Sequence, residues 1–293
     1  MEVSIDIDFT PRSPRPGVPY TESTFVRSSS RFTFRCEEIG IALVDLWNFG
    51  WEDGPVIDSL GWELSTERGT SHALRKKEII LNKIKPAVQS LRKQGIQIFH
   101  CNHPQFLSHY PQWYNSTTEE ERTHLVDLQE FCEVSMEEKT TAFPELEWQE
   151  TWRSRHRDDV FNVSWMNVQG HVYDRIKIPI EVEPQEGDML IYSKEQFDRL
   201  LRNRGIRVLF YMGFETDECI MNSTYGIRNM HSYGYMTNIV RDCTTTYESA
   251  ETVNGLWRTK VAIEQIEKLW GYSITSTELV QSFQKYNSDE LEL

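Results

Sequence analysis

Several features that would identify a class of protein are missing from this sequence. No apolar run approaches the roughly 18 residues that span a bilayer, so we expect no membrane-spanning segment. A Gly-rich phosphate loop and a Cys-x-x-Cys pair are both absent, which leaves nucleotide binding and a zinc module without support. The five cysteines are scattered and odd in number, unlike a disulfide framework.

Positive charge is also scarce, because 31 Lys and Arg stand against 45 Asp and Glu, and the net charge is −14. This balance disfavours nucleic acids and anionic membranes as partners. The first residues lack a basic segment followed by an apolar one, which is the pattern of a secretion signal. We therefore expect a cytoplasmic protein with a small-molecule partner.

The hydrophobic pattern predicts an α/β fold in which strands and helices alternate. The segment 39–44 (IGIALV) is apolar at every position, as expected for a strand buried on both faces. Such alternation favours a three-layer αβα arrangement around a mostly parallel sheet. The expected strands are 39–44, 96–99, 188–192, 206–212 and 235–240; the expected helices are 71–94, 196–204, 219–232 and 255–270.

Composition divides the chain into an arm and one large domain. Residues 1–31 are rich in Pro, Ser and Arg, so we expect an extended N-terminal arm before a domain at 32–293. Within the domain, 104–184 is an aromatic and acidic stretch, long for a connection in a compact fold. This insert is either a lid that excludes water or a scaffold extension, and the sequence leaves both open.

Three chemically complementary side chains are expected at one edge of the sheet. Asp45 directly follows the strand 39–44, Lys194 follows the strand at 188–192, and Cys219 follows a short turn after 206–212. The carboxyl ends of parallel strands lie at the same edge, where ligands bind in such folds. A cysteine at a helix N-terminus is favoured as a thiolate, so Cys219 is the expected nucleophile.

The motif around the cysteine resembles that of the isochorismatase-like cysteine hydrolases. The resemblance covers the Gly213-x-x-Thr216-x-x-Cys219 pattern and the later Thr224, Gly234-Tyr235 and Arg241-Asp242. That superfamily includes nicotinamidases, N-carbamoylsarcosine amidohydrolase and ureidoacrylate hydrolase. The resemblance implies an isochorismatase-like, Rossmann-like topology and a homodimer or homotetramer.

The same resemblance implies catalytic roles, with no cofactor. Asp45 matches the family's aspartate, Cys219 its nucleophile, and Lys194 the lysine that follows a Gly-Asp strand, here Gly187-Asp188. The interval from Lys194 to Cys219 is short for the family, so Lys177 is the alternative. A non-proline cis peptide bond is implied at Phe214–Glu215, with the N–H groups of Glu215 and Cys219 forming the oxyanion hole.

The implied activity is hydrolysis of a C–N bond, amide or ureido, through a cysteine thioester. Trp47 stands where the family has glutamine, and we expect it to line the substrate pocket with Phe49, His103 and Phe214. Carboxylates near the cysteine favour a neutral or cationic substrate over a dianion. The alternative hypothesis is a catalytically silent member that binds a small molecule or assists assembly.

A metal site has only weak candidates. Cys101 and His103 lie in a Cys-Asn-His-Pro segment that resembles the nicotinamidase Asp-x-His-Pro motif, and His109 follows. A cysteine and a histidine are acceptable zinc ligands, but a complete site needs a further ligand that the sequence does not identify. We therefore expect no metal, with His103 in a loop or pocket role.

Overall fold

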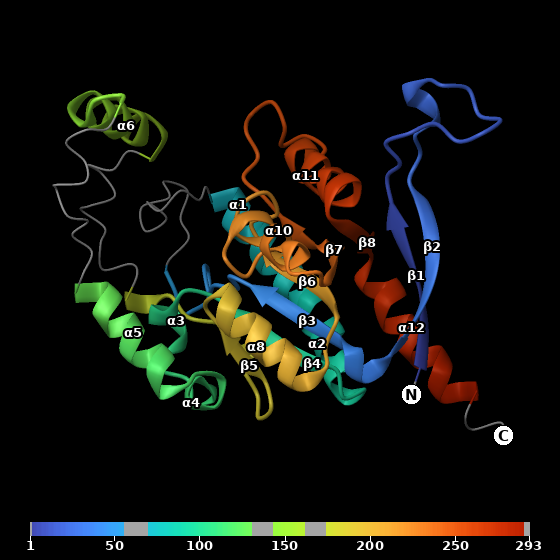
Figure 1. Ribbon diagram of the computed structural model, residues 1–293, viewed down its shortest axis with the longest axis horizontal. Helices are drawn as coiled ribbons and strands as arrows, with labels where there is room; N and C mark the ends of the chain where they lie inside the picture. Colours follow the sequence, from blue (N-terminus) through green and yellow to red (C-terminus); the bar gives the residue numbers. More distant parts are fainter. Residues whose placement is uncertain (1, 56–69, 131–142, 162–173, 290–293) are drawn as a thin grey trace.

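The fold is built on one eight-stranded sheet, seen here in a computed structural model that describes residues 2–55, 70–130, 143–161 and 174–289 (Figure 1). The strand order is β2-β1-β8-β7-β6-β3-β4-β5. From β8 to β5 every neighbouring pair is parallel, whereas β1 is antiparallel to both β2 and β8. The strands are β1 (Glu2–Phe9), β2 (Ser28–Arg35), β3 (Ile39–Val44), β4 (Gln97–Cys101), β5 (Met189–Ile191), β6 (Val208–Phe214), β7 (Met236–Thr245) and β8 (Gly271–Ile274).

Helices pack on both faces of this sheet, which confirms the predicted three-layer, mostly parallel architecture. One face carries α1 (Thr70–Ile79), the π-helical turn Ile80–Ile84, α2 (Lys85–Lys93) and α12 (Ser276–Asp289). The other carries α8 (Lys194–Arg204), α9 (Cys219–Asn222), α10 (Ile227–Ser232) and α11 (Trp257–Leu269). Strand β3 serves both cores because alternate side chains point to opposite faces: Ile41 and Leu43 enter the first, Ala42 and Val44 the second.

The helix expected at 71–94 is present as α1, the π turn and α2, and Pro86 lies in the first turn of α2. The Lys85 N–H donates to the Ile80 carbonyl, so α2 continues directly from the π turn, and Pro86, which has no N–H to donate, follows this change of helix type. Gly95 ends α2 with φ of 76° and donates its N–H to Arg92. Among the described residues, no helix is both long and apolar enough to cross a membrane.

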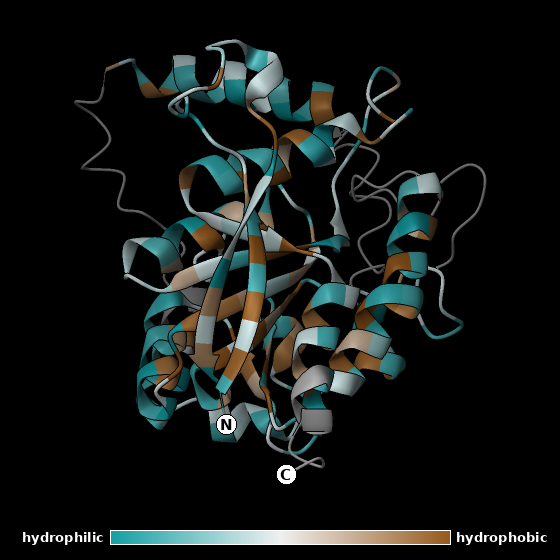
Figure 2. Ribbon diagram, turned by 90° about the vertical axis from the view of Figure 1, so that its right-hand side faces the viewer, coloured by the Kyte–Doolittle hydropathy of each residue, from teal (hydrophilic) through white to brown (hydrophobic). Residues whose placement is uncertain are grey.

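The N-terminal residues are extended, as expected, but they are part of the sheet rather than an arm outside the domain. β1 and β2 form an antiparallel hairpin, and the expected boundary at residue 31 falls inside β2. In β1, Val3, Ile5 and Ile7 are fully buried, and they alternate with exposed polar residues (Figure 2). This period of two is typical of a strand with one buried face. The guanidinium of Arg241 in β7 forms an ion pair with the Asp8 carboxylate at 2.7 Å, which holds the hairpin against the sheet.

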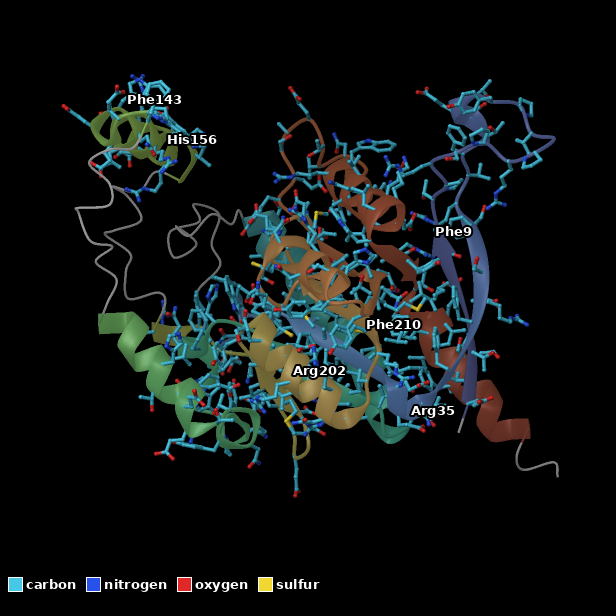
Figure 3. All side chains as sticks on the ribbon, in the orientation of Figure 1. Phe9, Arg35, Phe143, His156, Arg202 and Phe210 are labelled. Atoms are coloured by element: carbon cyan, nitrogen blue, oxygen red, sulfur yellow. The ribbon has the colours of Figure 1, made fainter. Side chains whose placement is uncertain are left out.

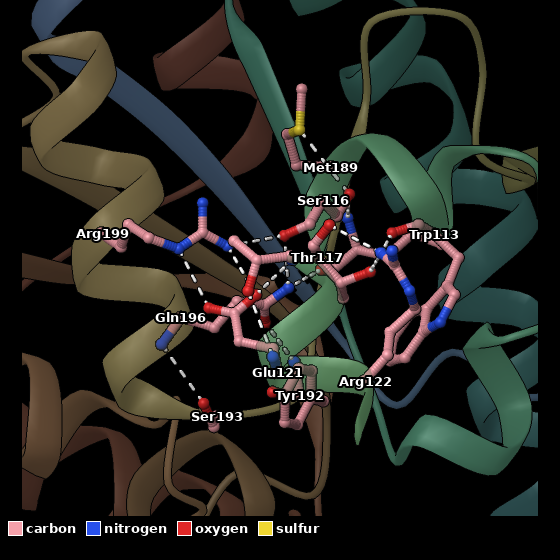
Figure 4. Close-up of polar contacts among 12 residues, drawn as sticks. Trp113, Ser116, Thr117, Glu121, Arg122, Met189, Tyr192, Ser193, Gln196 and Arg199 are labelled. Carbon is pink, nitrogen blue, oxygen red and sulfur yellow. Dashed lines mark hydrogen bonds and ion pairs between the residues drawn. The ribbon is translucent and has the colours of Figure 1, made fainter. Parts of the chain in front are cut away.

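The first part of the insert is bonded to the domain rather than separate from it. Its helices here are α3 (Pro104–Leu107), α4 (Gln112–Ser116) and α5 (Glu119–Glu130). Arg199 of α8 forms a two-pronged ion pair with Glu121, with distances of 2.9 and 2.8 Å, and also donates to the Ser116 carbonyl (Figure 4). Gln196 donates to the same carbonyl, so α4 is held against β5 and α8.

The second part of the insert contributes α6 (Leu146–Phe161) and the 3-10 turn Ile180–Val182. Figure 3 draws Phe143 and His156 apart from the packed side chains around Phe210. Phe143, Trp148 and Trp152 are exposed, the last two as a tilted ring pair. The remaining insert residues, 131–142 and 162–173, lie outside the described residues, so its function as a lid or scaffold stays a prediction.

The buried face of the hairpin makes a stability prediction. Ile5→Ala removes a fully buried side chain from the core, so we expect it to lower the free energy of unfolding by about 2–5 kcal/mol. Ser4→Ala, at an exposed neighbouring position, should change it by less than about 0.5 kcal/mol. Denaturant unfolding measures both. Equal, small effects would show that the hairpin folds independently of the sheet.

Candidate active site

The pairing of β3 with β6 brings the aspartate and the cysteine turn together. The strands are parallel with Val44 opposite Gly213, so Asp45 and Phe214 follow at the same edge. The backbones approach closely here, because a Cβ on Gly213 would lie 2.0 Å from the Val44 carbonyl oxygen. Gly213 also has φ of 120°, so only glycine satisfies both conditions without strain.

Asp45 is a buried carboxylate at this edge, with 2% of its surface exposed. Its φ of 47° is left-handed, a conformation that aspartate tolerates better than most residues, and its N–H donates to the Cys101 carbonyl at 3.0 Å. The Tyr225 hydroxyl donates to Asp45 Oδ1 at 3.3 Å, and Tyr211 in turn donates to the Tyr225 carbonyl. The backbone and these tyrosines fix the direction of the carboxylate.

Cys219 begins α9, and its thiol hydrogen-bonds the Asp45 carboxylate. Burial is the largest cause that raises the pKa of the Cys219 thiol, followed by the charge of Asp45, this hydrogen bond, and the charges of Glu215 and Glu218. The expectation that the position of Cys219 at a helix N-terminus makes it a thiolate in the resting protein is therefore wrong. The expected helix 219–232 is two short helices, and the four residues of α9 supply little dipole against three carboxylates.

The turn before the cysteine has the backbone that the family resemblance implied. The Phe214–Glu215 peptide bond is cis. The Glu215 carbonyl accepts from the N–H groups of Glu218 and Ile220, and Thr216 donates to the Thr245 carbonyl. Among the described residues, no hydrogen bond from the Cys219 N–H is found. The oxyanion hole formed by Glu215 and Cys219 stays a prediction.

Neither lysine expected at the site is brought to Asp45 and Cys219 by the contacts that the structure describes. The Lys194 ammonium lies 3.8 Å from Glu195 and 5.9 Å from the Tyr233 ring centre, at the start of α8. Lys177 pairs with Asp53 at 2.7 Å, and its side chain is 39% exposed. Both have surface carboxylates as their ion-pair partners.

A different lysine is buried beside the cysteine turn, and sequence reasoning missed it. Lys76 of α1 is 2% exposed and lies 2.6 Å from Glu215 Oε1. His72, one helical turn earlier, approaches Glu215 Oε2 at 3.0 Å. The signal was present: His72, Lys76, Ile80 and Ile84 recur every four residues, so both polar residues continue the buried stripe of the helix.

The expected pocket residues separate into buried and exposed members. Trp47 and Phe49 belong to a small buried cluster with Ala73, Phe106 and Ile176, and the Trp47 indole donates to Asn102 at 3.3 Å. Phe214 is fully buried, and its ring centre lies 4.8 Å from the Lys76 ammonium. His103 is exposed, and its backbone N–H donates to the Asn102 side chain.

The three weak candidates for metal ligands, Cys101, His103 and His109, do not form a common site. Cys101 points into the core from β4, whereas His103 and His109 are exposed, and the His109 ring lies against Tyr110 at 4.1 Å. Within residues 2–55, 70–130, 143–161 and 174–289, no group of three His, Cys, Asp or Glu side chains is arranged to hold a metal ion.

Comparisons with known proteins give similarities in structure alone. No protein-family model and no curated protein matches the sequence. A cysteine hydrolase from Pseudomonas syringae pv. phaseolicola is similar in structure, with a TM-score of 0.47 and 13% identity over 86% of this chain and 95% of that one. An isochorismatase family protein from Burkholderia thailandensis gives 0.43 and 13% over 85% and 96%.

An N-carbamoylsarcosine amidase from Thermoplasma acidophilum gives a TM-score of 0.37 and 14% identity over 82% of this chain and 96% of that one. The names of these three proteins belong to the group of cysteine hydrolases and isochorismatase-family proteins that the cysteine motif resembles. Similarities this low carry no information on substrate or catalytic residues, which have to be inferred from this chain's own contacts.

The contact between Asp45 and Cys219 predicts the effect of removing one charge. Asp45→Asn removes a negative charge and a charged acceptor, so the pKa of the Cys219 thiol should fall. At a pH below both pKa values, alkylation by iodoacetamide should quicken about tenfold for each unit of the fall. Mass spectrometry of the Cys219 peptide measures the rate. An unchanged rate would mean that the carboxylate does not control the thiol.

The positions of the lysines predict a second result. Lys194→Met removes an ammonium whose contacts are Glu195 and Tyr233, so the pH dependence of Cys219 alkylation should stay within about 0.3 units of wild type. Lys177→Met is the matched surface variant. If the pH profile of Cys219 alkylation shifted clearly upward in Lys194→Met and not in Lys177→Met, Lys194 would be the catalytic lysine, as the sequence motif predicts.

Proposed function

We propose that this protein is a hydrolase that attacks the carbonyl of a small amide or ureide with Cys219, using Asp45 as general base. The observation that carries the proposal is a half-buried thiol next to a buried carboxylate at the carboxyl edge of the sheet, where Asp45 raises the thiol pKa through its charge and a hydrogen bond. A nucleophile within hydrogen-bond reach of a base is the arrangement that acyl transfer requires. The raised thiol pKa makes the base necessary.

In the proposed reaction Asp45 accepts and returns a proton in each half of the cycle. Asp45 accepts the thiol proton while the sulfur bonds to the substrate carbon, and the carbonyl electrons move onto oxygen, which the N–H groups of Glu215 and Cys219 face. The C–N bond then breaks, and the leaving nitrogen takes the proton from Asp45. Water attacks the thioester, gives its proton to Asp45, and releases the acid as the thiol is restored.

The surroundings of the site favour a neutral or cationic substrate with a flat or apolar part. Trp47 supplies aromatic surface, whereas Phe214 is fully buried, and Asp45, Glu215 and Glu218 place negative charge near the sulfur. A dianionic substrate would be repelled by this charge. We place this hydrolysis in the cytoplasm, in a homodimer or homotetramer, without a cofactor.

One observation favours the alternative function, a catalytically silent binding protein. The groups that most affect the Cys219 thiol all raise its pKa, and a binding protein has no need to ionise that thiol. The two functions differ in what they require of Cys219, since binding does not need a sulfur.

The first experiment is ammonia release from a panel of nicotinamide, carbamoyl amino acids, ureidoacrylate-like compounds, biuret and aromatic amides. We expect release with wild type for at least one class and a loss of at least about 10³-fold in Cys219→Ala, because no thioester forms without the sulfur. Asp45→Asn should also lose release, although its cysteine alkylates faster. Trp47→Gln should change the order of preference among the substrates.

Two outcomes would contradict the proposal. Release that persists in Cys219→Ala would remove the covalent mechanism. No release across the panel, together with equal thermal stabilisation of wild type and Cys219→Ala by one of the compounds, would establish the silent binding protein instead.

A further inference from the structure

Negative charge is concentrated around the proposed nucleophile. Asp45 from the end of β3, and Glu215 and Glu218 from the turn after β6, all act on the Cys219 thiol. Each carboxylate makes both the thiolate and a developing oxyanion less favourable. A working site of this composition needs a compensating positive charge close to the carboxylates.

Few cations face this group from the packed elements. Arg258 of α11 pairs with Asp217 at 2.6 Å and lies 3.8 Å from Glu218, but it is half exposed and screened by solvent. Arg75 of α1 is directed to Thr245 and the Thr246 carbonyl. His72 of α1 contacts Glu215, and its ring lies 4.7 Å from that of Tyr247.

Lys76 differs from these in depth and contacts. The exposed fractions of the Lys76 and Glu215 side chains are 3% and 2%, with the ammonium and carboxylate 2.6 Å apart. The same ammonium lies 4.8 Å from the ring centre of Phe214 and 5.4 Å from that of Trp47. In surroundings with so little water, a charge acts more strongly and is screened less than one at the surface.

We propose that Lys76, reaching the site from α1, is the positive charge of this active site, and that it acts on Cys219 through the Glu215 carboxylate that it neutralises. Lys76 is proposed as a positioning residue, because the contacts described above join it to Glu215 and the two rings rather than to Cys219. The inference rests on the proposed function for its catalytic meaning, but its effect on the thiol is measurable without turnover.

The local geometry explains why the charge is needed at Glu215. In the proposed mechanism the backbone N–H of Glu215 stabilises the oxyanion. The negative charge of the Glu215 side chain has the opposite effect and destabilises it. With Lys76 at 2.6 Å, the pair is close to neutral at longer range, so the carboxylate no longer opposes charge on sulfur or oxygen. The family resemblance implied a lysine after β5, whereas this chain supplies one from a helix on the other side of the sheet.

A double-mutant cycle on Lys76 and Glu215 tests the inference. The rate of Cys219 alkylation by iodoacetamide is measured against pH by mass spectrometry for wild type, Glu215→Gln, Lys76→Met and the double variant. Each pH profile has a midpoint, which is the apparent pKa of the Cys219 thiol. Glu215→Gln removes a negative charge, so this midpoint should fall by about one pH unit, and the thiolate fraction at a pH below the midpoint should rise about tenfold. The double variant should return near wild type, and Lys76→Met should have the highest midpoint.

The decisive comparison is between Glu215→Gln, which keeps the buried Lys76 ammonium and removes its carboxylate partner, and the double variant, which removes both charges. These two differ only in Lys76. Equal midpoints would overturn the inference, and a higher midpoint in the double variant supports it. Lys76→Arg, which keeps the charge, should stay near wild type.

Lys77→Met is the matched control, since Lys77 is the next residue of α1 but donates to the Gly50 carbonyl and lies over Trp51. Its midpoint should equal that of wild type, and a shift as large as that of Lys76→Met would overturn the inference. Ammonia release separates this inference from the proposed function. Shifted midpoints without any release would reject the hydrolase and keep Lys76 as the cation that sets the thiol pKa.

Discussion

The parallel pairing of β3 with β6 is the constraint on which the site depends. Because Val44 lies opposite Gly213, the chain leaves both strands at the same level, and Asp45 meets the turn that carries Cys219. The close approach at Gly213 leaves no room for a side chain. The fold therefore determines the distance between the proposed base, Asp45, and the proposed nucleophile, Cys219, and the surrounding residues determine only their charge.

Much of the sheet could be predicted from the sequence because its strands are buried on both faces and its helices end at glycines. The segment 39–44 is apolar throughout, and Gly95 and Gly205 both adopt the left-handed conformation that ends a helix. The N-terminal hairpin was missed because Pro, Ser and Arg in its loop dominate the composition of 1–31. Its strand signal lies only in the alternation around Val3, Ile5 and Ile7, which overall composition does not detect.

The site was predictable where a residue directly follows a strand, and unpredictable where tertiary packing decides. Asp45 and Cys219 are placed by strand ends, so their meeting follows from topology. Lys194 also follows the end of a strand, β5, but it lies at the start of α8, where its ammonium is directed to Glu195. Lys76 lies on a helix that crosses the sheet, and sequence spacing shows that it is buried without showing what it faces. The same limit applies to the thiol pKa, which depends on three carboxylates from two segments that are distant in the sequence.

A thiol with a raised pKa is compatible with a nucleophilic function when proton transfer accompanies attack. In the proposed mechanism the carboxylate that disfavours the thiolate is also the group that accepts its proton, so charge moves from Asp45 to sulfur and then to the substrate oxygen without a net change in the site. What such a site cannot tolerate is a second carboxylate left uncompensated at the oxyanion. In the proposed mechanism Glu215 stands at that position, and its burial against Lys76 rather than in solvent is the arrangement expected if the pair contributes to the chemistry. A purely structural ion pair could lie anywhere along α1, whereas this one lies at the residue whose N–H we propose to face the reacting carbonyl.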